Sequence, residues 1–520
     1  MKSKRIRSIC VGLSTIVLFT SLVGCSGKKA ETSNNAKRTQ LKVEIFDRGG
    51  SKPGQQPIDN NDTTRYIQKN FGDKNNIDMK FVTVPRDKEV DQLNILMASG
   101  DAPDIIYTYD TDVFYKYAKQ GGLTDLSELL PKYGPNLVKY LGKDVVNYGK
   151  VGGKQFSIPS KRILVGNQSS VIRKDWLDKV GLPVPKTTQE FYTALKTFKE
   201  KDPGKVGDKI VPYVIDQFGY QMLADTFITK MTKEESYVYD TGANRPNPLR
   251  PGAIEGYRYL NKLFNENLIS LNFVLDKDGT IAKQNLVNGD DGSFTTNNGG
   301  GMDMLDQLKT SVPAAQYVAM DAFKNYEGKT VKGLNTPIGY NIMIPKNSKV
   351  APEAIKYLDW MTQPKVMLYL QNGIENIDYK MKDGIPSAII NKDITKLTYG
   401  GGNRNDWSLI ANGKDLGNKD KDIKAMANSF PGYEKLFIDE YKDSITDGVA
   451  GIKFDNPILA DGTYGTALNQ KWTDMVVKMI SCKPADLDKT FSQAKQVYLA
   501  NGGQQIMDER KTAYQAMKKK

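Results

Sequence analysis

Histidine is absent from this 520-residue sequence, and cysteine is scarce. Histidine is the usual general base near neutral pH and the commonest metal ligand. Its absence excludes Ser–His and Cys–His catalytic pairs and every zinc site that uses histidine. The three cysteines, Cys10, Cys25 and Cys482, are too few for a zinc site built from cysteine alone.

Long hydrophobic runs are also lacking after the first residues of the chain. A membrane-spanning helix needs about 20 consecutive apolar residues, and no run beyond residue 23 approaches that length. The formal net charge is +13, with lysines spread along the whole chain. Because there is neither a basic stripe nor a recognisable nucleic-acid-binding module, no nucleic-acid partner is expected.

Residues 1–24 have the pattern of a secretory signal peptide. Four basic residues precede the uncharged run 8–23, as in the n-region and h-region of such leaders. The run ends in Leu-Val-Gly-Cys, with the cysteine at Cys25. This ending resembles the lipobox of bacterial lipoproteins, which implies cleavage before Cys25 and lipidation of its sulfur, for example with palmitate. The alternative is an ordinary signal peptide with an accidental cysteine.

Residues 25–40 are polar and contain no large apolar side chain. Such a segment cannot bury enough surface to offset its ordering entropy, so a flexible tether is predicted. The sequence thus predicts a lipid-anchored protein on the extracellular face of the cell membrane. Since Cys10 would leave with the leader and Cys25 would carry lipid, Cys482 would have no partner for an internal disulfide.

The first part of the body alternates strands and helices. Strands are predicted at 41–46, 77–84 and 105–107, with helices over 59–71 and from Val90 to the breaker Gly100. This strand–helix–strand order predicts an α/β fold with a parallel sheet covered by helices. Further along, Thr187 and Glu190 predict a capping box at the start of a helix that reaches about Lys201.

Several stretches occur in an order typical of one family. They are LNILMASGDAPDIIY, GGLTDLSELL, KQFSIPS, VIRKDWLDKVGLPVPKTTQEFYTALKTFKEKDP, APEAIKYLDW and NGIENIDYK. Together they resemble the extracellular solute-binding lipoproteins (family 1) of bacterial ABC carbohydrate importers, particularly the large Gram-positive, Paenibacillus-like type. RKDWLDK followed by GLPVPKT is the most specific part of this resemblance.

The resemblance implies a bilobal, periplasmic-binding-protein-like (type II) α/β fold that closes on a ligand between its lobes. Lobe one would comprise 41–165 and 340–394, and lobe two 166–338 and 395–520. Extended segments at 154–160 and 163–172 would lead from one lobe to the other. The implied partners are an oligosaccharide and an ABC permease in the membrane, and a monomer is expected.

No cofactor is expected. Some large members of the family carry a calcium loop of EF-hand type after a KEKDP-like sequence. Here the corresponding stretch near Asp202 is shortened and lacks alternating oxygen ligands, whereas calcium takes six to eight oxygens. A calcium site is therefore not predicted.

Candidate ligand-binding residues stand mainly where predicted strands end, which is where ligands bind in open α/β sheets. Each could equally be a solvated loop residue. Glu375 matches a position of the family, and Arg48, Arg173 and Arg404 are plausible clamps if the ligand is a uronate. Trp407, in a glycine-flanked polar loop, could stack on a sugar or anchor the loop in the core. The full set is Asp47, Arg48, Asp101, Tyr109, Asp110, Arg173, Tyr340, Glu375, Arg404 and Trp407.

The function predicted from these observations is capture of an oligosaccharide and its delivery to an ABC permease, without catalysis. One alternative is an exported polysaccharide-degrading enzyme, which needs only two carboxylates. Another is a sugar sensor that feeds a membrane kinase. The identity, length and charge of the sugar do not follow from the sequence.

Overall fold

The computed structural model describes residues 38–49, 53–215, 219–240, 248–276, 280–299, 301–389, 404–454 and 458–519. Thr39–Lys520 form one compact unit. The predicted leader, Cys25 and nearly all of the tether lie outside the described residues. Within the described ranges, the helices are all too short or too polar to span a lipid bilayer.

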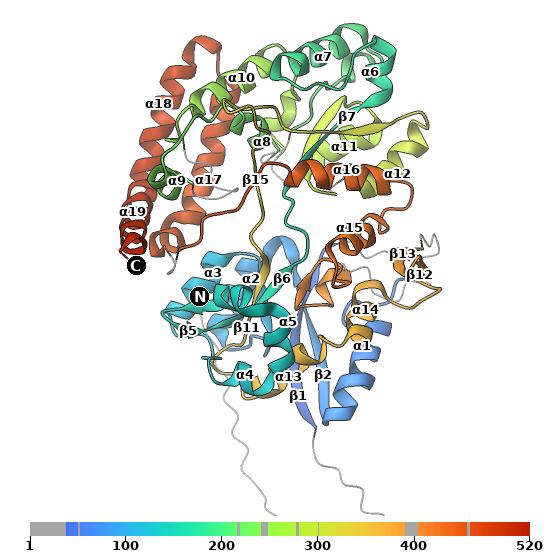
Figure 1. Cartoon of the computed structure of the whole chain (residues 1–520), viewed down its shortest axis with the longest axis vertical. Coiled ribbons are helices and arrows are strands. Elements are labelled where there is room, and N and C mark those ends of the chain that lie inside the picture. The colour runs from blue at the N-terminus through green and yellow to red at the C-terminus, as the bar shows by residue number, and fades with distance from the viewer. Residues whose placement is uncertain are drawn as a thin grey trace, which may run out of the picture. The chain divides into compact units, whose positions relative to one another are not determined.

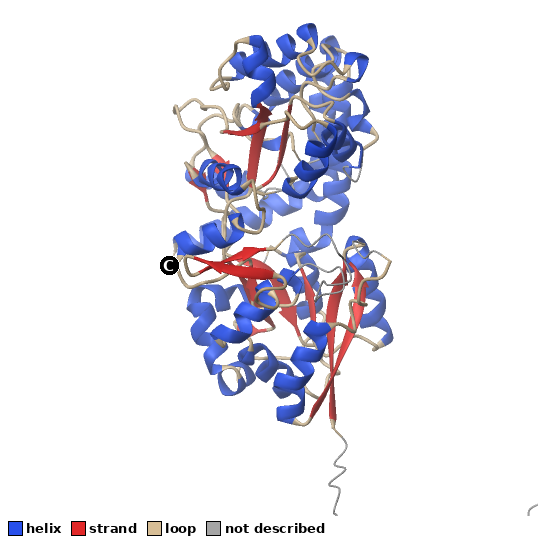
Figure 2. Cartoon of the chain, turned by 90° about the vertical axis from the view of Figure 1, so that its right-hand side faces the viewer, coloured by secondary structure: helices blue, strands red, loops and turns tan. Residues whose placement is uncertain are grey.

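The compact unit contains two lobes, each with its own sheet and apolar core (Figures 1 and 2). In the first lobe, β1 (Thr39–Asp47) pairs in parallel with β2 (Ile77–Pro85). A parallel bridge between Val43 and Ile105 joins β1 to the neighbouring four-stranded sheet. That sheet has the order β14–β6–β11–β3, formed by Ala411–Asn412, Ser157–Arg162, Ile338–Met343 and Ile106–Thr108.

Strand directions in this sheet are mixed. β14 is parallel to β6, whereas β11 is antiparallel to both β6 and β3. The predicted strands at 41–46, 77–84 and 105–107 are confirmed, and so is parallel pairing of the first two. The reversed β11 was not predicted. It arises because the chain returns to this sheet from the second lobe at the end where β6 finishes, so β11 runs back in the opposite direction.

Helices enclose the first sheet (Figure 1). The helix predicted over 59–71 is α1 followed by a π-helical turn, η1 (Gln68–Gly72). The helix predicted to end at Gly100 is α2, and Gly100 has the left-handed φ of 80° that favours glycine. The helices are α1 (Asp62–Ile67), α2 (Glu89–Ser99), α3 (Thr111–Lys119), α4 (Leu129–Tyr133), α5 (Pro135–Val146), α13 (Ala351–Trp360) and α14 (Pro364–Asn372). Short pairs are β4 (Lys150–Val151) with β5 (Lys154–Gln155), and β12 (Tyr379–Lys382) with β13 (Ile385–Ala388).

The second lobe is built on β7 (Gln168–Arg173), which lies between β8 (Ser293–Asn297) and β9 (Tyr317–Met320). Both neighbours are antiparallel to β7. Its helices are α6 (Lys174–Val180), α7 (Thr188–Lys201), α8 (Gln221–Asp225), α9 (Lys233–Tyr239), α10 (Ala253–Asn265), α11 (Thr280–Asn288), α12 (Met302–Ser311), α15 (Lys419–Ala427), α16 (Glu434–Ile445), α17 (Leu459–Ser481), α18 (Leu487–Tyr498) and α19 (Gln504–Lys518).

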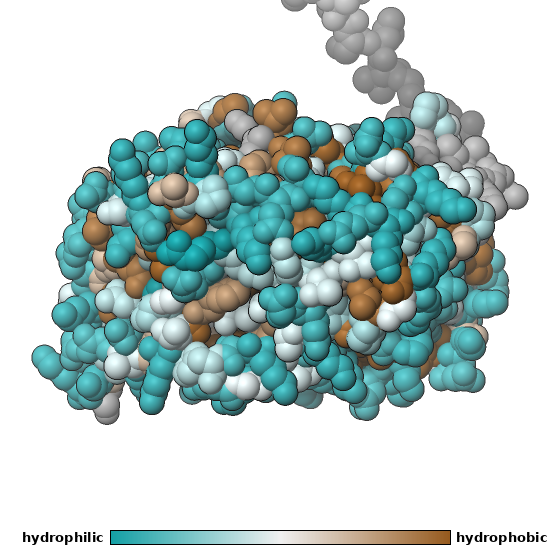
Figure 3. Space-filling view, turned by 90° about the horizontal axis from the view of Figure 1, so that it is seen from above, coloured by the Kyte–Doolittle hydropathy of each residue, from teal (hydrophilic) through white to brown (hydrophobic). Residues whose placement is uncertain are grey.

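The face of the molecule seen in Figure 3 is largely hydrophilic, and apolar side chains form separate areas on it. The apolar stripes of the helices are instead turned inward. In α7, Phe191, Leu195 and Phe198 are all buried, as their helical spacing predicts.

The predicted capping box at α7 is half formed. The Thr187 hydroxyl accepts a hydrogen bond from the N–H of Glu190 at 3.1 Å. The Glu190 carboxylate accepts from the N–H of Lys186 at 2.7 Å rather than from that of Thr187. The helix begins where predicted because one capping interaction already satisfies an orphan N–H of the first turn.

The packing differs from the predicted lobe division in one segment. Residues 395–520 are predicted to lie in lobe two, but Trp407, Leu409, Ile410 and Ala411 join the apolar core of the first lobe. They do so because β14 extends the first sheet by pairing with β6. The chain therefore crosses between the lobes three times within the described residues: after β6, before β11 and after β14.

A buried carboxyl in the second lobe predicts a pH-dependent stability. Glu440 on α16 is 1% exposed and accepts hydrogen bonds from the Ser169 hydroxyl and the Gly299 N–H, each at 3.3 Å. Burial raises the pKa of Glu440 to about 8. The folded state therefore holds a proton that the unfolded state releases near the ordinary value of 4.5. Stability is then full at low pH and falls as pH rises toward about 8.

The test of this prediction is urea denaturation of the wild-type chain and of Glu440→Gln at pH 5 and pH 8.5. Glutamine stays neutral and can still accept both hydrogen bonds. The variant should therefore lose less stability between the two pH values than the wild type. Glu44 in the first lobe, with a pKa raised to about 8 by burial, leaves a residual fall in both proteins. Equal pH dependence in both would refute the role of Glu440.

Candidate functional site

Polar side chains gather at one end of the strands of the first sheet. Four strands point the same way: β1 is parallel to β3 through the Val43–Ile105 bridge, and β3, β6 and β14 are parallel because β11 is antiparallel to β3 and β6. Their carboxyl ends therefore lie at the same end of the sheet. Ligands bind at this end of the strands in open α/β sheets. We call the residues gathered here the strand-end cluster: Arg48, Tyr109, Arg162, Asp406 and Asn412.

The cluster is centred on an ion pair. Arg48 follows β1, and its Nε and Nη2 donate to the two carboxylate oxygens of Asp406 at 2.7 and 2.8 Å. The Asp406 side chain is 1% exposed, whereas that of Arg48 is 30% exposed. Burial opposes the charge of Arg48, but Asp406 outweighs it and raises the pKa of the guanidinium. This two-point pairing fixes the plane of a guanidinium that still reaches solvent.

Tyr109, directly after β3, supplies a half-buried aromatic ring to the cluster. Its hydroxyl accepts from Arg48 Nη2 at 3.5 Å and from Asn412 Nδ2 at 3.4 Å. Its ring meets that of Tyr340 edge to face, with centroids 5.0 Å apart, and the Arg86 guanidinium lies 4.5 Å from its centroid. Burial, followed by the charge of Asp406, raises the pKa of Tyr109. The hydroxyl therefore stays protonated, and the cluster offers both hydrogen-bond donors and an apolar ring.

Among the predicted residues, the structure brings Arg48, Tyr109 and Tyr340 together. Tyr340 is 1% exposed, so it supports Tyr109 from beneath. Asp47 lies at the same end of the strands, but its carboxylate accepts from the Gly49 N–H at 2.8 Å. Asp110 is the N-cap of α3, accepting from the N–H groups of the first turn. These two acids have local structural partners.

Asp101 and Glu375 are exposed residues outside the strand-end cluster. Asp101 follows the last turn of α2, where its N–H donates to the carbonyl of Leu96 at 3.1 Å. Glu375 begins a short bridge to Tyr379 next to the β12–β13 hairpin. The structure places neither of them against Arg48 or Tyr109.

Arg173 is located in the core of the second lobe and is 1% exposed. Its Nε and Nη2 donate to Asp175 at 2.7 and 2.8 Å, and its guanidinium lies 4.7 Å from the ring centroid of Trp176. Arg404 pairs with Asp378 at 3.0 Å and donates to the Thr63 hydroxyl at 3.1 Å. All three predicted uronate clamps, Arg48 included, are thus already paired with a carboxylate of the chain.

Trp407 is 2% exposed and packs edge-on against Phe81 of β2, with ring centroids 5.4 Å apart. A ring enclosed in this way has no face left for a sugar. The sequence left two roles open for Trp407, and its burial fits the core anchor. Its neighbour in the chain is Asp406. We propose that Trp407 holds Asp406 in place beneath Arg48.

This role gives a testable outcome for Trp407→Phe. Phenylalanine still fills the core beside Phe81, so affinity for a glycan ligand should stay within about twofold. The lost apolar contact should reduce the free energy of unfolding by roughly 1–2 kcal/mol. Calorimetric titration and urea denaturation measure the two quantities. A tenfold loss of affinity with unchanged stability would show instead that the indole contacts the sugar.

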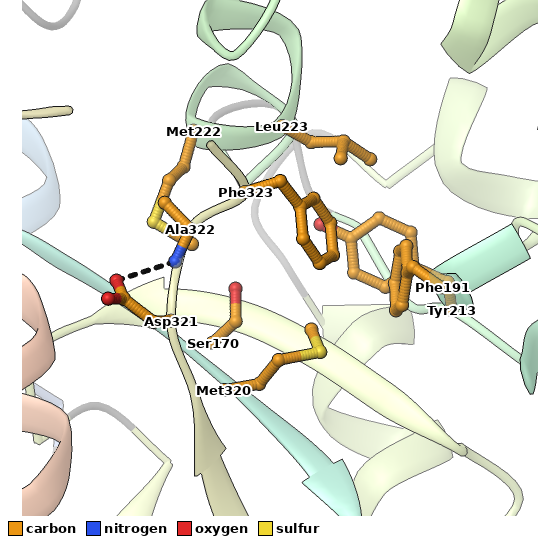
Figure 4. A pocket seen from close by; sticks show the side chains of 9 residues that line it. All are labelled: Ser170, Phe191, Tyr213, Met222, Leu223, Met320, Asp321, Ala322 and Phe323. Atoms are coloured by element: carbon orange, nitrogen blue, oxygen red, sulfur yellow. Dashed lines mark hydrogen bonds between the residues drawn. The ribbon is translucent and has the colours of Figure 1, made fainter. Parts of the chain in front are cut away.

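A small pocket lies in the second lobe where the chain leaves β9 (Figure 4). Phe191, Tyr213 and Phe323 form an apolar wall, and the Asp321 carboxylate accepts from the N–H of Ala322 at 2.7 Å. The Ser170 and Tyr213 hydroxyls both bond to Thr295, at 2.6 and 2.8 Å. Its free space is about that of one water molecule, so it is too small to hold a sugar ring.

The stretch that resembles a shortened calcium loop is satisfied by its own backbone. Asp202 accepts from the N–H groups of Val206 and Gly207 at 2.9 and 2.8 Å. Within the described ranges, no three acidic or cysteine side chains gather as metal ligands would.

Sequence reasoning missed Asp406, Asn412 and Arg162. Asp406 and Arg48 are 358 positions apart, so no local pattern connects them. Asp406 precedes the predicted Trp407, and that proximity was the one available signal. Asn412 and Arg162 end β14 and β6. The strand-end rule would have found Asn412 only if β14, a two-residue strand, had been recognised. It would have found Arg162 only if the extended segment predicted at 154–160 had been continued to residue 162.

This is a two-lobed α/β unit with a polar and aromatic cluster at the strand ends, where the chain crosses between the lobes. It is the architecture of a solute-binding protein. Residues 58–368 match the family described as bacterial extracellular solute-binding protein. The chain therefore belongs to this family. Its members bind solutes for ABC transporters and are not enzymes, so the polysaccharide-degrading alternative is set aside.

Curated relatives extend this similarity. Lipoprotein LipO of Bacillus subtilis (strain 168) is 26% identical over 518 residues, covering 96% of each chain. The polygalacturonan/rhamnogalacturonan-binding protein YtcQ of the same strain is 30% identical over 189 residues, 36% of each chain. The fructooligosaccharide ABC transporter substrate-binding protein FusA of Streptococcus pneumoniae serotype 4 is 31% identical over 161 residues, 28% of this chain and 26% of FusA.

Among solved structures, the alginate-binding protein AlgQ2 without calcium ion has a TM-score of 0.67. It is 19% identical, and the match covers 92% of this chain and 98% of AlgQ2. This likeness establishes the bilobal α/β fold, as the sequence resemblance predicted.

Proposed function

We propose that this protein captures an oligosaccharide between its lobes and delivers it to the permease of an ABC importer. The observation that carries the proposal is the strand-end cluster. A half-buried tyrosine ring lies beside a guanidinium and an amide whose planes are fixed by bonds at 2.7 to 3.5 Å. Sugar sites need this combination of an apolar ring face and oriented hydrogen-bonding groups.

The names of the relatives support the ligand class. YtcQ is named for polygalacturonan and rhamnogalacturonan, and FusA for fructooligosaccharides. The ligands in both names are carbohydrate polymers or oligomers, although those of YtcQ are acidic and those of FusA are neutral. Arg48 remains the predicted residue with both an exposed guanidinium and a place at the strand ends, so it is the proposed ligand contact beside Tyr109.

Anchoring is part of the proposal. We infer that Cys25 carries two acyl chains and that residues 26–38 form the tether. The predicted tether ran to Gln40, but Thr39 and Gln40 pair with β2 as the start of β1. A single acyl chain holds a protein to a membrane only marginally, whereas two anchor it stably. The coarser property, an extracellular protein, follows from the family. We expect a Cys25→Ser protein to be released into the culture medium. The membrane fraction should then lose the protein that carries the acyl mass.

The lobe division is also proposed, in revised form. Of the described residues, lobe one would comprise those within 39–162, 338–389 and 404–412, and lobe two those within 168–320 and 419–519. The basis is the membership of each segment in the two sheets and their cores.

The test of the ligand class is calorimetric titration of residues 26–520 with neutral and uronic-acid oligosaccharides. One glycan class should bind and be recovered intact. At 100 times its dissociation constant, the glycan should stabilise the fold by about 2.7 kcal/mol. Binding of a peptide or another solute, with no glycan bound, would contradict the proposed ligand class.

A further inference from the structure

The three crossing segments are bonded to one another where they leave the first sheet. After β6, the N–H of Ile163 donates to the carbonyl of Asn412 at 3.0 Å, which links the first crossing to the third. The N–H of Arg162 donates to Pro337 at 2.9 Å, which links the first crossing to the second. Arg162, the last residue of β6, thus occupies the position where all three meet.

The Arg162 side chain binds the same segments a second time. Its Nε donates to the carbonyls of Thr336 and Ile338 at 3.0 and 3.1 Å, and its Nη2 to that of Gly339 at 3.5 Å. Its Nη1 donates to Asn412 Oδ1 at 3.4 Å. Across the part of the chain that the structure describes, no carboxylate pairs with this guanidinium. Its bonds are therefore all to neutral groups of the second and third crossings.

Asn412 connects this junction to the proposed sugar contacts. Its Oδ1 accepts from Arg162, and its Nδ2 donates to the Tyr109 hydroxyl at 3.4 Å. The missing side chain of Gly339 makes room for Asn412, because a Cβ at position 339 would come within 2.4 Å of the Asn412 Cβ. A continuous series of contacts thus runs from Arg48 and Tyr109 through Asn412 to Arg162.

We propose that Arg162 is a positioning residue that couples ligand binding at Tyr109 to the geometry of the three crossing segments. This inference rests on the proposed function. Any change in the angle between the lobes must alter backbone torsions in these segments, since they are what joins the two cores. Arg162 binds two of the three and is itself the start of the other. It therefore restricts the crossings, and through Asn412 it places the Tyr109 hydroxyl.

The geometry of a guanidinium, rather than its charge, is what this role requires. Four acceptors lie around one planar fork, and a lysine ammonium cannot reach them from a single point. Arg162→Lys should therefore resemble Arg162→Met. Asn412→Ala should separate the two parts of the role, because it removes the link to Tyr109 but leaves the bonds to Thr336 and Ile338.

The experiment measures affinity and lobe separation in residues 26–520, which contain neither Cys10 nor Cys25. Cys482→Ser removes the natural thiol, and labels at Lys132→Cys on α4 and Lys489→Cys on α18, both exposed, report the distance between the lobes. The probe is whichever glycan binds the wild type by calorimetry. Arg258→Met, which removes an exposed arginine of α10, is the matched control.

Arg162→Met and Arg162→Lys should both bind the glycan at least tenfold more weakly and show a broader distance distribution without ligand. Asn412→Ala should weaken binding but keep the wild-type distribution. The inference is overturned if Arg162→Met binds within twofold and keeps that distribution, or if lysine restores both. If the wild type binds no glycan, the proposed function fails, whereas the unliganded distances still test Arg162. If Arg162→Met does not fold, Asn412→Ala with unchanged affinity is the contradicting result.

Discussion

Replacing Arg173 with methionine should lower the free energy of unfolding by about 3–5 kcal/mol. The guanidinium is 1% exposed and bonds to both carboxylate oxygens of Asp175, at 2.7 and 2.8 Å. Its Nη1 also donates to the carbonyl of Gly289 at 3.3 Å. Removing one partner of a buried ion pair leaves the other charge unpaired and poorly solvated, which is the reason for the large effect.

Two aromatic rings add to the loss of stability expected when Arg173 is replaced. The Arg173 guanidinium lies 4.7 Å from the centroid of Trp176 and 5.7 Å from that of Tyr317. The Tyr317 hydroxyl donates to Asp291, a fully buried carboxyl whose pKa is raised to about 6 by burial. Methionine would keep part of the apolar contact but leave both acids without the cation.

Urea denaturation measures this loss, and Arg258→Met is the control. Arg258 is 44% exposed and pairs with Glu255 and Asp488 at 3.2 and 2.9 Å. Exposed pairs contribute about 0–1 kcal/mol, so its loss should be small. If Arg173→Met is no less stable than Arg258→Met, the buried cluster does not support the second lobe as described.

Replacing Asp406 with asparagine should weaken glycan binding by tenfold or more. Asparagine has nearly the same shape, but it carries no charge and offers Arg48 one acceptor oxygen in place of two. Hydrogen bonds to charged groups contribute about 1.5–3 kcal/mol each, and tenfold in affinity corresponds to about 1.4 kcal/mol. Arg48 would no longer be held in one plane beside Tyr109.

Asp78→Asn is the matched control for this change. Asp78 lies on β2, is 42% exposed, and pairs with Lys80 at 3.3 Å. Its replacement should alter affinity by less than twofold, since exposed pairs contribute little and it lies outside the cluster. Calorimetric titration of both variants gives the comparison. Unchanged affinity in Asp406→Asn would show that the Arg48–Asp406 pair takes no part in recognition.

The local elements that the sequence predicted correctly share one property: their signals lie within about one helix or strand. The alternation in 41–46 gives β1, and the Thr187 cap with its apolar stripe gives α7. The resemblance supplied the two-lobed fold, which no local pattern contains. It also identified RKDWLDK as its most specific part, and the buried Arg173–Asp175–Trp176 contacts give that motif a structural reason.

The candidate site was predicted less well because it depends on distant pairings. Strand-end reasoning found Arg48 and Tyr109, which are in the cluster. The same reasoning found Asp47 and Asp110, whose carboxylates instead bond to nearby backbone N–H groups. The three arginines looked alike in the sequence, and the structure pairs each of them with a carboxylate. They differ in exposure, because the side chain of Arg48 is 30% exposed, whereas those of Arg173 and Arg404 are 1% and 12% exposed. Such compensation becomes visible only when the fold places both charges.

The most direct test of the central claim is a crystal structure of residues 26–520 with the glycan that binds most tightly. A sugar ring against Tyr109, with its hydroxyls within hydrogen-bond distance of Arg48 or Asn412, is the predicted result. A glycan bound at another surface, with the strand-end cluster free of ligand, would contradict the account and assign recognition to residues elsewhere in the chain.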